Sequence, residues 1–323
     1  MVSNTISNAL RPASLMYNIG RQVRQIWARS RAFPLPNIVL GGITTGGSGK
    51  TPTALAIAKL LQTQGSNVHF LSRGYGRTKN ARSSIIQVTT AHTAHEVGDE
   101  PLLLAEVAPT WVATDRFKAA QEASQVGAQV LILDDGFYNP YLQAMLAVLV
   151  YDAFQGVGNG RLLPAGPLRA PIVAALKKAD LIVSIGGDFP FASVSPSMPV
   201  LTADLVPVLP KDYLDQHWIA FAGIGHPDKF FEMLRAYNFP LTEVHAFPDH
   251  HSYTSAEMKL LHHKAETFAA RLITTRKDFV RLPNASRASV VCLDVSFVWR
   301  HPESDVRCLL NTLMTRRDSA TPV

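Results

Sequence analysis

The stretch Thr44-Thr45-Gly46-Gly47-Ser48-Gly49-Lys50-Thr51 decides how the rest of this chain is interpreted. The apolar residues 38–40 precede it, and a helical pattern rich in Ala, Leu and Ile follows over residues 52–61. A strand, a glycine-rich turn and a helix start in this order form a phosphate cradle, because backbone N–H groups and the positive end of the helix face the anion. We expect Lys50 to reach the β- and γ-phosphates of a nucleotide and the Thr51 hydroxyl to ligate Mg²⁺. The stretch is therefore a predicted P-loop.

One position departs from the full P-loop pattern. Glycine is usual where this chain has Thr44, although Gly46, Gly47, Gly49 and the following Lys-Thr pair are all present. The alternative is an ordinary glycine-rich turn between a strand and a helix. Because strand, Lys-Thr pair and helix are all in register, the pattern favours nucleotide binding.

The composition describes a globular chain that is long enough for two domains. Of its 323 residues, 47% are hydrophobic and 17% are charged. The two cysteines, Cys292 and Cys308, lie within apolar patterns and form neither a disulfide framework nor a metal cluster, which favours a reducing cytosol. No apolar run approaches the ~20 residues that span a bilayer, and the N-terminus lacks the apolar core of a signal peptide.

Charge is distributed unevenly along the chain. Residues 1–95 contain eleven Lys and Arg and no acidic residue, whereas the remaining 228 residues contain 20 basic and 25 acidic side chains. A one-sided positive region predicts an anionic partner, either a phosphorylated ligand, a nucleic acid or an anionic membrane surface. No helix-turn-helix, zinc-finger or aromatic RNA-binding signature is present, so we do not expect nucleic acid.

Residues 10–31 have the pattern of a basic amphipathic helix. Such a helix suits the headgroup layer of a membrane, where it would lie partly buried without spanning. Packing on its own domain with a solvated polar face is an equally good explanation of this segment alone. The apolar side would carry Leu15, Ile19, Val23, Ile26 and Trp27, and the polar side Arg21, Arg24, Gln25 and Arg29.

A second candidate for metal binding follows a buried strand. The apolar residues 130–133 lead directly into Asp134 and Asp135. A carboxylate at the end of a strand beside a P-loop typically holds Mg²⁺, directly or through water. The alternative is an acidic turn, but the P-loop upstream favours the metal.

Two acidic or histidine clusters have less decisive patterns. Asp99 and Glu100 precede Pro101, where a helix would begin, and capping of that helix is the more usual role for such acids. Asp249 and His250 follow a predicted strand, and an Asp-His pair there could act as a general base with its orienting partner. A histidine in isolation is more often structural.

Two glycine-rich segments have the composition of ligand-binding loops. Residues 72–77, which include Arg73, follow a strand, and ligands bind at the carboxyl ends of strands in open α/β sheets. Residues 156–171 are rich in Gly and Pro, are long for a connection and contain Asn159, Arg161 and Arg169.

The order of predicted elements indicates an α/β fold with two domains. Strands alternate with helices in both halves of the chain, which is typical of mostly parallel sheets. Five prolines between residues 187 and 217 mark a change of composition. We therefore predict a membrane-interface helix at 1–31, a P-loop core at 32–186, an extended ribbon linker at 187–217 and a smaller α/β domain at 218–323.

Taken together, these motifs resemble one family. GGSGKTP, SRGYG, VGDEP, DDG, GNGRLLPAGPLR, AGIG, FPDHH and the Lys-Asp of TRKD occur in the order and spacing of the tetraacyldisaccharide 4'-kinases, the lipid A 4'-kinases of Gram-negative bacteria. The resemblance extends from the N-terminal helix to about residue 283. GNGRLLPAGPLR and VGDEP are far more specific than the P-loop.

The resemblance implies a fold, an activity and a location. It implies a P-loop core and a smaller α/β domain joined by a β-ribbon, working at the cytoplasmic face of the bacterial inner membrane. It also implies transfer of the γ-phosphoryl group of ATP, with Mg²⁺, to the 4'-hydroxyl of a tetraacylated glucosamine disaccharide 1-phosphate. Four acyl chains leave a bilayer only at ~0.8 kcal/mol per CH₂, which favours the membrane role of the N-terminal helix. No obligate protein partner is implied.

The resemblance also implies roles for individual residues. Asp99 would be the catalytic base and His250 its polarising partner. Lys50 and Thr51 would bind phosphate and Mg²⁺, with Asp134 and Asp135 around the metal. The candidates for binding the substrate or the transferring group are Arg73, Arg116, Asn159, Arg161 and Arg169.

The sequence departs from the family pattern at three positions, and two alternative functions remain open. Gly42 replaces an Asn, Tyr138 replaces a Gln, and Ala170 replaces the acid that normally follows the Pro-Leu-Arg sequence. The last two motivate a nucleotide-binding homologue with reduced turnover. A P-loop ATPase switch is the other alternative, but such proteins place a signature Lys where this chain has Thr45.

Overall fold

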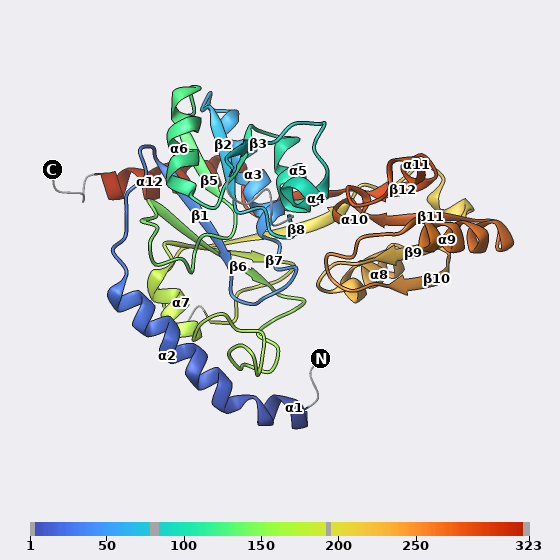
Figure 1. The fold of residues 1–323 in the computed structure, drawn as a ribbon, viewed down its shortest axis with the longest axis horizontal. Helices are drawn as coiled ribbons and strands as arrows, with labels where there is room; N and C mark the ends of the chain where they lie inside the picture. The colour runs from blue at the N-terminus through green and yellow to red at the C-terminus, as the bar shows by residue number, and fades with distance from the viewer. Residues whose placement is uncertain (1–3, 78–83, 192–194, 319–323) are drawn as a thin grey trace.

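The protein folds around two sheets of unequal size (Figure 1). The structure is a computed structural model and describes residues 4–77, 84–191 and 195–318. The larger sheet has nine strands in the order β13-β8-β7-β6-β1-β5-β2-β4-β3, and the smaller has four in the order β10-β9-β11-β12. Most neighbouring strands are parallel. The predicted α/β fold with a mostly parallel sheet and a second, smaller α/β domain is confirmed.

The centre of the large sheet places the P-loop. Strand β1 pairs in parallel with β5 on one side and β6 on the other, so all three carboxyl ends meet at one edge. Their residues are buried apolar runs, as expected for strands covered on both faces. The strands are β1 (Asn37–Gly42), β2 (Val68–Ser72), β3 (Ile86–Gln87), β4 (Thr110–Val112), β5 (Val130–Leu133), β6 (Leu146–Asp152), β7 (Leu181–Ile185), β8 (Val200–Pro207) and β13 (Val295–Trp299).

Helices cover both faces of this sheet. Ile38 and Leu40 of β1 pack in one core with α3 (Lys50–Gln62), α5 (Asp99–Ala105) and α12 (Glu303–Asp318). Val39 points the other way, into a core shared with α6 (Arg116–Gln125) and α7 (Ile172–Lys178). This alternation along one strand is what a pleated sheet between two helical layers requires.

The small sheet is also covered on both faces. Helix α8 packs with Trp218 on one side, and α9 packs with Ile219 on the other. The elements are β9 (His217–Ala222), β10 (Leu241–Ala246), β11 (Ala270–Thr275), β12 (Val290–Leu293), α8 (Pro227–Ala236), α9 (Ser255–Thr267), α10 (Arg276–Phe279) and α11 (Asn284–Arg287). A short 3-10 helix, Tyr213–Asp215, precedes β9.

The structure corrects the predicted extent of the second domain, 218–323. After β12 the chain returns to the large domain, where β13 pairs antiparallel with β8. Val306 and Leu310 of α12 are then buried in the large core. The predicted linker, 187–217, likewise contains β8, a strand of the large sheet. The prediction failed because β13 and α12 follow β12 closely in sequence with no marked linker between them, and only long-range pairing shows which sheet they join.

The N-terminal segment forms α1 (Asn4–Ala9) and α2 (Arg11–Trp27), along the lower left of Figure 1. Helix α2 attaches to the 156–171 loop through polar groups: Ser14 Oγ donates to Leu162 O at 2.8 Å, and Tyr17 Oη donates to Arg169 O at 3.1 Å. Its large apolar side chains face outward, with Ile26 80% and Trp27 82% exposed.

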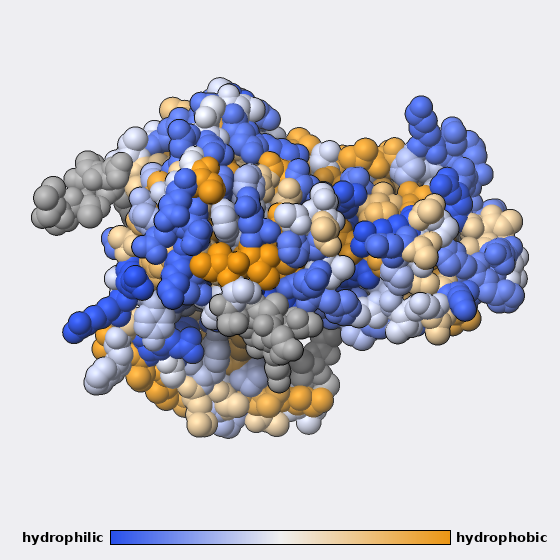
Figure 2. Space-filling view, turned by 45° about the horizontal axis from the view of Figure 1, so that its top comes forward, coloured by the Kyte–Doolittle hydropathy of each residue, from blue (hydrophilic) through white to orange (hydrophobic). Residues whose placement is uncertain are grey.

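Apolar atoms accordingly appear along the lower margin of the space-filling view (Figure 2). Such an arrangement is the reverse of a helix that packs its apolar side on its own domain. No helix in the described part of the chain is long and apolar enough to span a membrane.

Candidate active site

The P-loop connects β1 to α3 through a tight turn that depends on glycine. Gly46 and Gly49 have φ angles of +77° and +78°, in the left-handed region, and Gly49 immediately precedes α3. A Cβ atom on Gly42 would lie 2.2 Å from Ser48 Oγ. A side chain at position 42 would therefore have to displace the Ser48 side chain.

The first two residues of the motif face the 156–171 side of the site. Thr44 Oγ1 donates to Gln155 Oε1 at 2.8 Å, and Gln155 Nε2 donates to Thr45 O at 2.8 Å. The Thr45 backbone N–H donates to Pro167 O at 2.9 Å. These bonds fix the start of the loop, and residues 46–51 form its turn into the helix.

Thr51 and Asp134 come together at the adjoining ends of β1 and β5. Thr51 Oγ1 lies 3.4 Å from Asp134 Oδ2, while Asp134 Oδ1 is buried without a hydrogen-bond partner among the described residues. Burial, and then the nearby charge of Glu100, raise the pKa of Asp134 to about 7. A divalent cation would offset both effects, since it stabilises the ionised carboxylate.

The donor set fits Mg²⁺ better than a transition metal. No group of three or more His, Cys, Asp or Glu side chains with metal-binding geometry occurs in residues 4–77, 84–191 and 195–318. Mg²⁺ is typically held by one or two carboxylates together with water and substrate phosphates. Asp134 with Thr51 meets that requirement, and Asp135 follows directly.

Asp135 anchors two of the predicted arginines. Arg169 Nη1 forms an ion pair with Asp135 Oδ1, and Arg116 Nη2 donates to the backbone oxygen of Asp135 at 3.3 Å. Arg116 is buried, and its Nε and Nη1 have no hydrogen-bond partner in the described chain. Burial, and then the charge of Arg73, lower the pKa of Arg116 to about 10. Three cationic side chains thus converge beside the acidic turn.

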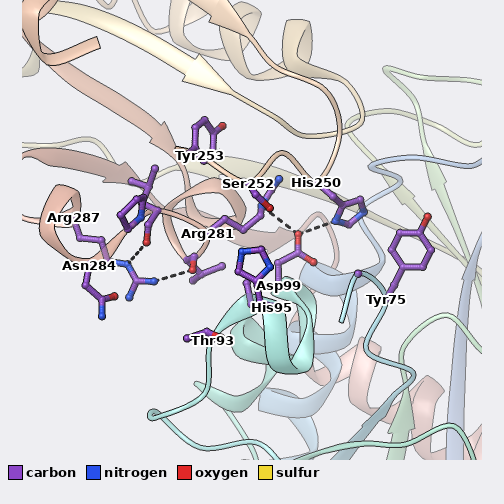
Figure 3. A pocket seen from close by; sticks show the side chains of 15 residues that line it. Tyr75, Thr93, His95, Asp99, His250, Ser252, Tyr253, Arg281, Asn284 and Arg287 are labelled. Carbon is purple, nitrogen blue, oxygen red and sulfur yellow. Dashed lines mark hydrogen bonds and ion pairs between the residues drawn. The ribbon is translucent and has the colours of Figure 1, made fainter. Parts of the chain in front are cut away.

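Asp99 and His250 meet across the two domains (Figure 3). Asp99 is the first residue of α5 and only 4% exposed, and His250 follows β10 in the loop of the small domain. His250 Nδ1 lies 2.9 Å from Asp99 Oδ2. His250 has a φ of 58°, and its backbone N–H donates to Gly223 O at 3.0 Å. The predicted pair is therefore in hydrogen-bonding contact, 151 residues apart in sequence.

The charge state of Asp99 is set by this contact and by two further cations. Burial acts to raise the pKa of Asp99, but the hydrogen bond from His250 and the charges of Lys277, His250 and Arg281 outweigh it and lower the pKa to about 2. Lys277 Nζ and Arg281 Nε lie 3.9 Å and 3.4 Å from Asp99 Oδ2. Asp99 is thus ionised throughout the neutral range.

Lys277 and Arg281 were not among the site residues predicted from sequence. Both follow β11, and Lys277 also pairs with Glu100 at 3.0 Å. Between them, Asp278 is completely buried and accepts hydrogen bonds from Tyr253 Oη and from Gly223 N, both at 2.8 Å. The signal in the sequence that could have identified them is the Lys-Asp of TRKD. This pair is one of the motifs that carry the resemblance, but it was given no role.

Removing the Arg281 charge is expected to destabilise the small domain. Arg281 Nη2 lies 3.1 Å from the fully buried Asp278, so Arg281→Met leaves a buried carboxylate without its charged partner. The expected loss is on the order of 3 kcal/mol in the free energy of unfolding, measured by chemical denaturation. Arg281→Lys should recover much of it. Arg300→Met, which removes an exposed pair with Asp204, is the control and should change stability little. Equal losses in the two Met variants would contradict this account of Asp278.

Further ion pairs join the two domains around the site. Lys229 of α8 pairs with the buried Asp152 at the end of β6, and Arg276 pairs with Glu106 at 2.7 Å. The backbone at Gly225 lies against the P-loop, since a Cβ atom there would be 3.0 Å from Gly47 N. The domains are therefore closed over the P-loop in this structure.

A cavity of about 290 Å³ opens onto the Asp99–His250 pair (Figure 3). Both domains contribute to its walls, with Tyr75 from the turn after β2 and Arg281 and Arg287 from the small domain. The Tyr75 ring lies 5.2 Å from the His250 ring, centroid to centroid. The carboxylate and imidazole are thus accessible to a ligand between the domains.

Two predicted site residues lie elsewhere in the structure. Asn159 Nδ2 donates to Ser7 Oγ and to Ala165 O, both at 2.9 Å, and Arg161 Nη1 donates to Ser7 Oγ at 2.7 Å. These contacts tie α1 to the 156–171 loop. The structure brings neither side chain into contact with the P-loop, the acidic turn or the Asp99–His250 pair among the described hydrogen bonds.

Comparison with known proteins gives a consistent result over nearly the whole chain. A family model described as tetraacyldisaccharide-1-P 4'-kinase matches residues 6–314. The tetraacyldisaccharide 4'-kinase of Gluconacetobacter diazotrophicus is 44% identical over 303 residues, covering 93% of this chain and 92% of the relative. That of Rhodospirillum centenum is 41% identical over 318 residues, covering 97% and 93%. The crystal structure of LpxK from Aquifex aeolicus in complex with ATP is 26% identical and superposes with a TM-score of 0.72, covering 96% of this chain and 99% of that one.

Proposed function

The chain belongs to the tetraacyldisaccharide-1-P 4'-kinase family, and we propose that it performs the reaction of that family with Asp99 as the base. It is a kinase of lipid A biosynthesis, and ATP is its phosphoryl donor. In the proposed reaction the 4'-hydroxyl oxygen of a tetraacyl glucosamine disaccharide 1-phosphate bonds to the γ-phosphorus of ATP. The bond from that phosphorus to the β,γ-bridging oxygen breaks, ADP leaves, and the hydroxyl proton passes to Asp99.

The observation that carries this proposal is the contact between Asp99 and His250 beside the P-loop. A carboxylate with a pKa of about 2 is a weak base. Phosphoryl transfer nevertheless proceeds through a loose transition state with little bond formation, so the acceptor needs to be ionised and well placed more than strongly basic. Lys277 and Arg281 keep Asp99 ionised, and His250 orients it.

Residues 46–51 would hold the ATP phosphates, and Thr51, Asp134 and Asp135 would hold Mg²⁺. The buried, unpartnered Oδ1 of Asp134 supports this assignment. The ion would supply positive charge that neutralises the phosphates during transfer. Lys50, Arg116 and Arg169 would add fixed positive charge around the transferring group, and Arg73 would extend it toward the exposed side. Thr44 and Thr45 would hold the loop in place.

One experiment tests the function directly. The protein is incubated with γ-labelled ATP and tetraacyldisaccharide 1-phosphate in detergent micelles. Label transferred to the lipid supports the kinase. Release of labelled inorganic phosphate without lipid labelling would instead identify the P-loop ATPase switch. ATP binding without either product would identify a homologue with reduced turnover, for which Tyr138 and Ala170 are the motivating departures.

The outward apolar side of α2 supports a location at the membrane. We propose that α2 lies in the headgroup layer at the cytoplasmic face of the bacterial inner membrane, with Ile19, Val23 and Trp27 inserted. The five arginines before residue 32, with no acid nearby, would strengthen binding to anionic lipids. The active site would thereby reach a substrate whose acyl chains stay in the bilayer.

Replacing Ile19, Val23 and Trp27 by Ser is expected to weaken binding to anionic vesicles on the order of a hundredfold, since each exposed side chain loses its apolar burial. Co-sedimentation measures the change, and the Kd for ATP should not move. Leu260→Ser is the control, because Leu260 is 58% exposed on α9 of the small domain. Vesicle binding that survives the triple substitution would exclude α2 as the anchor.

A further inference from the structure

A histidine of the small domain lies against the glycines of the P-loop. His226 immediately precedes α8 and is half-buried. A Cβ atom built on Gly46 would lie 3.6 Å from His226 Nε2, and one built on Gly47 would lie 4.0 Å from His226 Cδ2. The imidazole therefore borders the part of the loop whose backbone N–H groups turn toward nucleotide phosphates.

The backbone just before His226 approaches the loop more closely still. A Cβ atom on Gly225 would lie 3.0 Å from Gly47 N and 3.1 Å from Gly46 Cα. Contacts this short leave little room for a side chain, so glycine at position 225 allows the two backbones to meet. This close approach places the next residue, His226, beside the phosphate cradle.

Helix α8 is tied to the large domain by an ion pair of its own. Lys229, in the first turn of α8, pairs with Asp152, whose side chain is 1% exposed at the end of β6. Strand β6 pairs with β1, so Asp152 lies at the same sheet edge as the P-loop. An unpaired buried charge is strongly destabilising, which keeps this ion pair formed. The pair thus holds the first turn of α8, and with it His226, against the loop.

Structural roles leave the imidazole of His226 unexplained. A residue before a helix often caps it, but His226 makes no side-chain hydrogen bond to the start of α8. Neither ring nitrogen has a hydrogen bond or an ion pair within the part of the chain that the structure describes. By contrast, His245, His250 and His251 of the same domain each contact a carboxylate. Packing against glycine requires no polar ring, so the nitrogens of His226 are available to a ligand.

The surroundings of His226 correspond to the γ end of a bound nucleotide. Asp249 Oδ2 lies 3.4 Å from the Cβ position of Gly225 and 3.8 Å from His250 Nε2. A short series of contacts therefore leads from the residue next to His226 to the proposed base, Asp99. Because the base must lie where the acceptor oxygen attacks the γ-phosphorus, this side of the loop faces the γ-phosphate.

We propose that the Nε2–H group of His226 donates a hydrogen bond to an oxygen of the γ-phosphate of ATP, across the closed interface between the domains. The proposal rests on the proposed function, because it takes ATP as the phosphoryl donor and the closed protein as the reacting state. Negative charge spreads over the γ-phosphoryl oxygens during transfer, and fixed donors aimed at them stabilise the transition state. His226 remains a donor throughout, and the hydroxyl proton passes to Asp99.

A donor on the small domain also couples the γ-phosphate to domain closure. The P-loop and Lys50 belong to the large domain, whereas His226 reaches the phosphates only when the domains are closed. ADP lacks the group that His226 would bind, so ATP should favour the closed state more than ADP does. Loss of this hydrogen bond after transfer would then favour opening and the release of ADP.

The first test compares the Kd for β,γ-imido ATP with the Kd for ADP, each with Mg²⁺ and without lipid, by titration calorimetry. His226→Phe keeps a planar ring against the glycines and removes both nitrogens. It should weaken binding of β,γ-imido ATP about ten- to a hundredfold, the usual effect of losing a hydrogen bond to a charged group, and leave ADP binding unchanged. His226→Gln, which can present an amide N–H, should recover part of the loss. His245→Phe, on β10 of the same domain, is the matched control and should keep both Kd values.

The second test measures turnover with tetraacyldisaccharide 1-phosphate in micelles at saturating ATP. The kcat of His226→Phe should fall about tenfold or more, because a donor to developing charge contributes more in the transition state than in the ground state. His226→Gln should fall less, and His245→Phe should keep the wild-type kcat.

Two results would overturn the role of His226. One is His226→Phe with a normal melting curve, a wild-type kcat and an unchanged ratio of the two Kd values, while active wild-type protein leaves the proposed function intact. The other is equal weakening of ADP and β,γ-imido ATP binding, which would indicate a general effect on the loop. Wild-type protein that binds ATP without phosphorylating the lipid would overturn the proposed function, whereas the two Kd values would still decide whether His226 contacts the γ-phosphate.

Discussion

Asp99→Ala is expected to lower kcat by roughly 10²–10⁴-fold with little change in KM for ATP, because it removes the proposed proton acceptor and leaves the P-loop unchanged. His250→Ala should cost less, since His250 orients the carboxylate without taking the proton. Steady-state kinetics of the four proteins in a double-mutant cycle measure the coupling. The double variant should lose less than the product of the two single effects, because residues that act as a unit are non-additive.

Strict additivity of the two losses would show that Asp99 and His250 do not work together, despite their 2.9 Å contact. Glu106→Ala, which removes the interdomain ion pair with Arg276, is the control for a general effect on domain closure. If it reproduced the loss of kcat, the effect would belong to closure and not to the base.

The pH profile separates the two possible proton acceptors. With a folded-state pKa of about 2, Asp99 stays ionised from pH 5 to 8, so its own titration should not limit kcat in that range. An acid limb in the neutral range, where histidine generally titrates, would instead identify His250 as the acceptor and Asp99 as its orienting partner. The depressed pKa also contributes stability that is present above the ordinary aspartate pKa and is lost as pH falls toward 2.

Lys50→Ala and Asp134→Asn are expected to lower kcat by about 10²–10³-fold or more while the fold stays intact. Each removes charge stabilisation at the phosphates that forms no part of the core. Turnover is measured with saturating ATP and Mg²⁺, and folding by the melting curve. Thr53→Ser, within the same helix but bonded to Gly49 O, is the control and should keep wild-type kinetics. Near wild-type turnover in either variant would refute the phosphate and Mg²⁺ assignments.

The raised pKa of Asp134 also predicts how the stability of the metal-free protein depends on pH. Its folded-state pKa of about 7 lies above the ordinary aspartate value, so the stability it contributes at low pH is lost as pH rises through 7. Metal-free wild-type protein should therefore lose stability between pH 5 and 8 from this group, and Asp134→Asn should not. Added Mg²⁺ should restore the wild type at pH 8 and leave the variant unchanged. A variant that melts far below the metal-free wild type would indicate a structural role for Asp134 instead.

The return of the chain to the large domain shows that local sequence pattern does not determine which domain a strand or helix joins. Alternating strands and helices predicted the α/β class, because each strand and helix can be identified from a pattern of neighbouring residues. The predicted domain at 218–323 placed residues 295–318, which form β13 and α12, in the wrong domain. Pairing of β13 with β8 and burial of Val306 and Leu310 depend on which sheet edge and which apolar surface remain uncovered. Those quantities exist only once the rest of the chain has folded.

The candidate site divides in the same way. The sequence by itself determined the P-loop and the acidic turn, because a glycine-rich phosphate cradle and a strand-end carboxylate are each built from consecutive residues with local backbone requirements. Only the tertiary structure decided that Lys277 and Arg281 lie beside Asp99 and that Asn159 supports α1. Charge acts through space, and a side chain's pKa or partner depends on neighbours that can be more than a hundred residues away. The outward apolar side of α2 follows the same rule, since an amphipathic pattern specifies two faces but not which one the protein covers.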